Sequence, residues 1–83
     1  MEIKLIPLAT KKMKLRRISL KWVEETVQNP DQIVVGYHNR KVRQKIYLCK
    51  GKEYLLRVIG EENGNKFIVI TAYLTSRIDK YWR

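Results

Sequence analysis

The sequence is short of the residues that metal centres and disulfide frameworks require. Among its 83 residues there is one cysteine, Cys49, and one histidine, His38. An internal disulfide needs two cysteines, and a zinc site needs several cysteine, histidine or carboxylate ligands. The composition therefore excludes an internal disulfide and predicts no metal site and no cofactor. Cys49 is interpreted as a small apolar residue in or near a strand.

Long apolar segments are also missing. No run approaches the roughly 18 apolar residues that span a bilayer, and the N-terminus carries no apolar stretch of signal-peptide length. We therefore expect a cytoplasmic protein without a membrane partner. Residues 1–83 are expected to form one domain with a small core, because chains of this size bury roughly 60 to 65% of their unfolded surface.

Acidic residues are scarce relative to basic ones. The chain has 8 Asp and Glu against 18 Lys and Arg, which gives a net charge of +10. No acid occurs between Ile3 and Val23, and a second acid-free stretch runs from His38 to Lys52. An excess of one sign raises the encounter rate with molecules of the opposite charge. The expected partner is RNA or DNA, or an acidic protein that competes for the same surface.

The start of the chain favours a short strand followed by a helix. The strand is predicted at Ile3 to Ile6, and Pro7 then interrupts it. The next segment, Ala9 to Arg17, is typical of a very basic helix in which Ala9 and Met13 face inward.

A second helix is predicted to follow at once. Ser19 is a typical N-cap, and Asn29-Pro30-Asp31 stops the helix because proline lacks an amide hydrogen. Trp22, on the flank of this helix, is interpreted as a residue that covers the core. Apolar residues that share one helical face recur at three- and four-residue spacing, namely Leu20, Val23 and Val27.

Beyond Pro30 the residue types change to those of strands. Short connections, including an Asn-Gly pair, predict an antiparallel meander. Together with the two helices on one face, this gives an α+β fold with a four-stranded antiparallel sheet, to which a C-terminal helical turn within Thr75 to Arg83 is added. The predicted strands are Gln32 to Tyr37, Val42 to Cys49, Glu53 to Ile59 and Lys66 to Leu74. Their predicted core residues are Val42, Ile46, Leu48, Leu56, Val58, Ile68, Ile70 and Ala72.

The other face of this sheet is the predicted working surface. Side chains in a strand alternate between faces, so a shift of one residue would exchange them. Cations mixed with phenols and a hydroxyl suit a phosphate-bearing ligand. With the strand phases given above, this face carries Arg43, Lys45, Tyr47, Arg57, Thr71 and Tyr73.

The segment Leu8 to Ser19 resembles the opening motif of a small bacterial and archaeal family of unknown function. In outline that motif reads His-Ala-x-x-Arg-Met-x-x-Arg-x-Ile-Ser. The matching residues are Ala9, Met13, Arg16, Ile18 and Ser19. Val23, Thr26, Val27 and Asn29-Pro30-Asp31 are similar to the family's next helix and its stop, and residues 69–73 resemble its last strand.

This family resembles the RelE, ParE and BrnT toxins of toxin–antitoxin pairs. The resemblance implies two helices against an antiparallel sheet, an acidic antitoxin protein as partner, and RNA cleavage without a metal in the RelE and BrnT branches. Two positions depart from the motif. Leu8 replaces the usual histidine, which removes the expected acid–base residue, and Lys12 replaces an arginine and loses its bidentate fork.

Metal-free RNA cleavage needs a base for the 2′-hydroxyl, cations for the phosphorane and a proton donor for the leaving oxygen. Arg57 and Arg43 can hold the phosphate here, Lys45 or Lys12 can supply charge or a base, and Tyr73 or Tyr47 can donate a proton or stack on a base. The catalytic residues selected from these are Arg57, Lys45 and Tyr73. His38 is interpreted as a solvated turn residue. The predicted nucleic-acid contacts are Lys12, Arg16, Arg43, Tyr47, Thr71 and Arg77.

Three functional hypotheses stay open at this point. The first is a toxin-like, metal-independent endoribonuclease. The second is a non-catalytic module that binds RNA or DNA, and the third is a protein-interaction domain that an acidic partner neutralises. The first and third can both hold.

Overall fold

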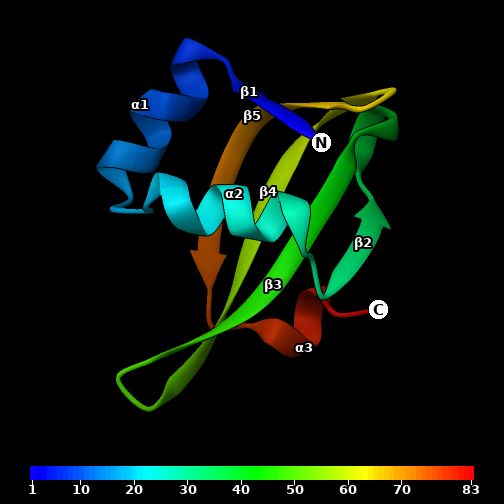
Figure 1. Ribbon diagram of the computed structural model, residues 1–83. Coiled ribbons are helices and arrows are strands. Elements are labelled where there is room, and N and C mark those ends of the chain that lie inside the picture. The colour runs from blue at the N-terminus through cyan, green and yellow to red at the C-terminus, as the bar shows by residue number, and fades with distance from the viewer.

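The computed structural model describes residues 1–83 and contains a five-stranded sheet with two helices across one face and a short helix against the other (Figure 1). The strand order is β1-β5-β4-β3-β2. None of the helices is long and apolar enough to cross a membrane. The elements are β1 (Glu2–Leu5), α1 (Pro7–Leu15), α2 (Leu20–Gln28), β2 (Gln32–Val35), a 3-10 turn η1 (Tyr37–Asn39), β3 (Lys41–Cys49), β4 (Lys52–Asn63), β5 (Lys66–Thr75) and α3 (Ile78–Tyr81).

The predicted α+β class is confirmed, but the predicted four-stranded antiparallel sheet is wrong. Strands β2 to β5 form the expected antiparallel meander. The N-terminal strand β1 then joins the outer edge of β5 in parallel, with Glu2 opposite Lys66 and Leu5 opposite Val69. The sheet is therefore mixed and has five strands. This pairing joins the first and last strands of the chain, so no turn motif between neighbouring strands predicts it.

Helix α1 begins earlier than predicted because Pro7 starts it instead of interrupting the chain. Proline suits the first helical position, where its missing N–H would have had no partner. Ala9 and Met13 are buried against the sheet as predicted. The helix ends at Leu15, and Arg17 then adopts a left-handed backbone conformation with φ 55°. This turn directs the chain into α2.

Helix α2 starts at the predicted cap and crosses the sheet. The Ser19 hydroxyl accepts a hydrogen bond of 3.1 Å from the Trp22 backbone N–H. Val23 and Val27 are fully buried as predicted, whereas Leu20 in the first turn is 51% exposed. Leu20 lies beside a groove between the two helices rather than over the core.

The core between helices and sheet differs in part from the predicted set. Leu56, Val58 and Ala72 face the helices as predicted. A β-bulge between Ile59 and Gly60 changes the phase of β5, so Phe67 and Val69 enter this core in place of Ile68 and Ile70. On β3 the predicted phase is wrong by one residue. Tyr47 is the β3 residue in the core, and the residues that alternate with it point to the other face, namely Val42, Ile46 and Leu48.

Candidate functional site

The six side chains predicted to share one face are divided between two faces. Because Tyr47 enters the helix-side core, residues two positions away on β3 point to that side as well. Residues that pair with Gln44 point to the opposite side, which we call the open face of the sheet. The helix side therefore holds Arg43, Lys45 and Tyr47, and the open face holds Arg57, Thr71 and Tyr73.

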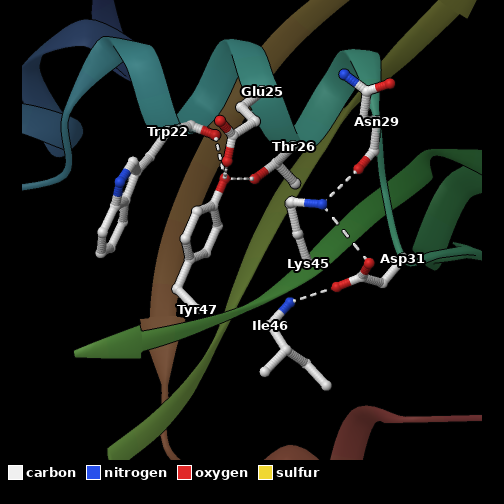
Figure 2. A network of polar contacts seen from close by, with 8 residues as sticks. All are labelled: Trp22, Glu25, Thr26, Asn29, Asp31, Lys45, Ile46 and Tyr47. Carbon is white, nitrogen blue, oxygen red and sulfur yellow. Dashed lines mark hydrogen bonds and ion pairs between the residues drawn. The ribbon is translucent and has the colours of Figure 1, made fainter. Parts of the chain in front are cut away.

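Arg43 and Lys45 support the C-terminal end of α2 instead of forming part of a binding surface. Arg43 Nη1 donates a 2.8 Å hydrogen bond to the Val27 carbonyl, and its Nη2 lies 2.8 Å from the Glu62 carboxylate. Lys45 Nζ donates to the Asn29 carbonyl at 3.0 Å (Figure 2). Cations at a helix C-terminus satisfy its free carbonyls and its negative dipole end. Both residues are therefore structural.

Tyr47 belongs to a buried polar network under α2 (Figure 2). Its ring stacks on Trp22 with centroids 4.2 Å apart. Its hydroxyl lies 3.0 Å from the Glu25 carboxylate and 3.1 Å from both the Thr26 hydroxyl and the Trp22 carbonyl. Burial raises the pKa of Tyr47 to about 12. Tyr47 and Trp22 therefore cover the helix-side core and lie away from the other face of the sheet.

The raised pKa of Tyr47 predicts how its contribution to stability depends on pH. Tyr47→Phe removes a buried hydrogen-bonded hydroxyl and is expected to cost roughly 1 to 2 kcal/mol at neutral pH. Between the unfolded value of 10.0 and the folded value of about 12, only the unfolded wild-type chain loses this proton. Wild-type stability is therefore lost as pH rises, and the difference between the two proteins should vanish within that window and change sign near its top.

Urea unfolding of wild type and Tyr47→Phe at several pH values measures this difference, because the other tyrosines contribute equally to both proteins. A stability difference that stays constant from neutral pH to the top of the window would contradict the assignment.

The open face contains a cavity of about 760 Å³ between η1, the central strands and α3. Its lining combines cations with aromatic rings and one threonine hydroxyl, and it includes no aspartate or glutamate. Glu61 lies 4.0 Å from the Arg40 side chain but is not part of the lining. The polar and aromatic lining residues are Tyr37, His38, Arg40, Arg57, Thr71, Tyr73, Lys80, Tyr81 and Arg83.

A row of four paired residues runs across this face and positions Arg57. In register these residues are Gln32 on β2, Gln44 on β3, Arg57 on β4 and Tyr73 on β5. Arg57 Nε donates to Gln44 Oε1 at 3.0 Å, and Nη1 donates to the Tyr73 hydroxyl. The guanidinium carbon also lies 4.1 Å from the centre of the Tyr81 ring. We call these four residues the polar row.

Arg57 is held in place but keeps free donors. A guanidinium has five N–H donors, and two of them are used within the polar row. The remaining three have no partner in the chain, and Arg57 makes no ion pair. A fixed cation with free donors is suited to bidentate contact with a phosphate.

The polar row also anchors the tail that follows β5. Gln32 Nε2 donates to the Arg83 carbonyl at 2.7 Å, and the Arg83 N–H donates to Gln32 Oε1 at 2.9 Å. The fully buried Gln44 donates to Gln32 Oε1 at 2.8 Å and to the Tyr81 carbonyl at 3.2 Å. These contacts hold α3 so that Lys80, Tyr81 and Arg83 line the cavity.

The two tyrosines beside Arg57 have pKa values shifted in opposite directions. Burial raises the pKa of Tyr73, and the adjacent Arg57 opposes this shift. The Tyr73 hydroxyl lowers the pKa of Tyr81, and the cations Lys80 and Arg57 lower it further. Of the two phenols, Tyr73 therefore has the higher pKa and loses its proton less easily.

The other predicted contact residues lie at the rim or away from the cavity. Arg16 reaches the part of β5 that lies beyond its pairing with β1, where Arg16 Nη1 donates to the Thr71 hydroxyl at 3.2 Å and to the Ala72 carbonyl at 2.9 Å. Lys12 on α1 and Arg77 at the N-cap of α3 do not line the cavity. Leu8, at the position of the motif histidine, is half-exposed on α1 and also lies outside the lining.

Several residues of the cavity were not predicted from the sequence. His38 lies in an exposed turn as expected, but this turn brings it and Arg40 to the cavity. Tyr81 and its neighbours Lys80 and Arg83 come from the tail. The alternation of cations and rings in the tail and the glutamine within β3 were the available signals. Neither indicates on its own which face of the sheet is involved.

Most of the chain matches a known protein family. Residues 9–74 match the model of a family described as Domain of unknown function (DUF4258). The chain belongs to the DUF4258 family. The match includes Arg57 and Tyr73, whereas α3 lies beyond it. Comparisons with curated proteins and with solved structures gave no match. DUF4258 membership assigns no activity.

Proposed function

We propose that this DUF4258 protein binds single-stranded RNA in the open-face cavity. The observation that carries the proposal is the lining of that cavity. It contains four cations, Arg40, Arg57, Lys80 and Arg83, together with three tyrosines and no aspartate or glutamate. Phosphates bind such cations, and unpaired bases stack on aromatic or guanidinium planes. The net charge of +10 favours the same class of ligand.

Individual residues have distinct parts in this proposal. Arg57, fixed by Gln44 and Tyr73, offers its free donors to one phosphate. Tyr37 is 92% exposed at the cavity mouth and is free to stack on a base. Thr71 supplies a hydroxyl near the β5 edge that Arg16 occupies. A single strand suits the site because its bases are accessible, whereas those in an A-form duplex are not.

The proposal is tested by fluorescence anisotropy with a labelled single-stranded RNA at increasing salt. Arg57→Ala is expected to weaken binding roughly 10- to 100-fold, because it removes a charged hydrogen-bond donor. The matched control is Lys21→Ala, an exposed cation on α2 that carries the same charge change. Equal losses for both variants would mean that charge alone drives binding and would reject the cavity as the site.

A second candidate function, metal-independent RNA cleavage, is favoured by the arrangement around Tyr73. Arg57 donates to the Tyr73 oxygen, Tyr73 keeps its own phenolic proton as a donor, and His38 lines the same cavity. In this scheme His38 takes the 2′-hydroxyl proton, Arg57 and Lys80 stabilise the phosphorane, and Tyr73 protonates the 5′-oxygen. Lys45, predicted as a catalytic residue, has no part because it lies on the opposite face.

Cleavage is tested by incubating RNA with the protein in EDTA and mapping the ends. The scheme predicts 2′,3′-cyclic phosphate and 5′-hydroxyl ends. It also predicts that Tyr73→Phe lowers the cleavage rate roughly 100-fold, which is within the range for one acid–base group, and that it keeps most of the RNA affinity. Cleavage at an unchanged rate in Tyr73→Phe would exclude this role, and binding without any cleavage would leave the protein as an RNA-binding module.

A toxin-like role in a two-protein system is the broadest form of this proposal. It is supported by the motif from Ala9 to Ser19 and by the two helices packed across the meander. Such a role implies an acidic protein partner, for which the cavity is one docking site among the surfaces of the molecule.

A further inference from the structure

A second hollow lies on the helix side of the sheet, and its lining residues differ from those of the open-face cavity. It is a groove of about 330 Å³ whose lining residues come from the end of β1, helix α1, the turn after it and the start of α2. It shares no lining residue with the larger cavity. Its lining is mostly apolar and consists of Leu5, Thr10, Met13, Lys14, Ile18 and Leu20.

The helical segments that line this groove and the turn between them are basic, and we call their exposed cations its rim. Lys14 lies within the lining, and the others are next to a lining residue in the chain. None of these cations forms an ion pair, and there is no acid in the sequence from Ile3 to Val23. The cations are Lys11, Lys14, Arg17 and Lys21. An apolar floor with an unpaired basic rim is complementary to an acidic surface that carries apolar side chains.

Arg17 is kept at this rim in an uncommon backbone conformation. Its φ of 55° lies in the left-handed region, which glycine adopts more easily than a residue with a Cβ. The turn that contains it makes hydrogen bonds from Arg17 N–H to the Lys14 carbonyl at 3.2 Å and from Ile18 N–H to the Met13 carbonyl at 2.9 Å. The backbone at this position would favour glycine, whereas a long cation is present.

We propose that this groove binds an acidic segment of a second protein, with a bulky apolar side chain of that segment inserted between Met13, Ile18 and Leu20. Charge complementarity identifies the partner: carboxylates would face the unpaired rim cations. The Leu20 side chain, which is 51% exposed, would become buried on binding, and this loss of exposed apolar surface would stabilise the complex.

Other occupants fit the groove less well. The lining has no aromatic ring and, besides Lys14, only Thr10 as a polar side chain, so it offers an RNA base neither stacking nor a pattern of donors and acceptors. A second copy of this chain would bring another +10 of charge to the same rim. Of these occupants, an acidic protein segment complements both the apolar lining and the rim cations.

The test uses two fluorescein-labelled acidic peptides of about 15 residues, which is the length of a short docking segment. Both carry the same number of glutamates, and one has leucines where the other has alanines. The leucine peptide is expected to bind about 10-fold more tightly to the wild-type protein. Leu20→Ser should remove most of this difference, and Arg57→Ala should leave it unchanged. This pattern separates the groove from the RNA cavity.

A further variant guards against a simple loss of folding. Arg17→Gly removes a rim cation but suits the left-handed backbone, so it should weaken the leucine peptide about threefold while unfolding stability is kept or raised. Equal binding of both peptides, or no effect of Leu20→Ser, would overturn the proposal. Displacement of the leucine peptide by RNA together with an equal loss of RNA affinity in Leu20→Ser would also overturn it, and would assign the groove to RNA.

Discussion

Gly60→Ala is expected to destabilise the protein by at least about 3 kcal/mol, which is the scale of severe overpacking in a core. A Cβ at this position would lie 2.3 Å from the Ile68 carbonyl oxygen and 2.5 Å from Cε1 of the Phe67 ring. The first neighbour is backbone in the paired strand, and the second is a fully buried ring. Neither can move without disturbing the β-bulge that changes the phase of β5.

The matched control for this substitution is Gly64→Ala. Gly64 has a φ of 59° in the β4–β5 turn, and a Cβ there would meet nothing within 4 Å. Only the backbone strain of about 1 kcal/mol is then expected. Thermal or urea unfolding of both variants measures the difference. Similar losses of stability in the two variants would show that the close packing at Gly60 is not a determinant of the fold.

Gln44→Leu is expected to cost roughly 3 kcal/mol and to reduce RNA affinity about as much as Arg57→Ala. The amide is fully buried and makes three hydrogen bonds, to Gln32, Arg57 and the Tyr81 carbonyl. Leucine has a similar size but would leave these partners without a hydrogen bond, and each buried group left unpaired costs about 1 to 3 kcal/mol. Arg57 would lose one of its two fixed contacts.

Gln28→Leu gives the same chemical change at an exposed site. Gln28 makes one hydrogen bond, from its Nε2 to the Met1 carbonyl at 2.8 Å. We expect a change in stability below about 0.5 kcal/mol and no change in RNA binding. Urea unfolding and RNA anisotropy on the same samples provide both readouts. Normal RNA affinity in a folded Gln44→Leu protein would contradict the role given to the polar row.

The elements with local signals were predicted well from the sequence. The Ser19 cap, the proline stop after α2 and the Asn63-Gly64 turn each act within a few residues of the chain. On β4, Leu56 and Val58 are predicted to face the helices because the alternative register would place the charged Arg57 between them in an apolar core. The open-face position of Arg57 therefore followed directly from its neighbours.

The face of β3 could not be predicted in the same way, because this strand is covered on both sides. Val42 is buried under the open-face elements, and Tyr47 is buried under α2. Alternation alone cannot decide between two covered faces. Arg43 and Lys45 reach the end of α2 with long side chains, a role that depends on how the helix crosses the sheet. The parallel pairing of β1 and the bulge at Gly60 are likewise set by contacts distant in sequence.

The dependence of the cavity on the tail has a consequence for diversity among DUF4258 proteins. The residues after β5 lie outside the matched family segment and contribute nothing to the central hydrophobic cluster, yet they supply Lys80, Tyr81 and Arg83. Mutation of these three residues changes the lining of the cavity while the central cluster beneath stays intact. Under the proposed RNA-binding function, ligand selectivity can therefore change without a change in the core.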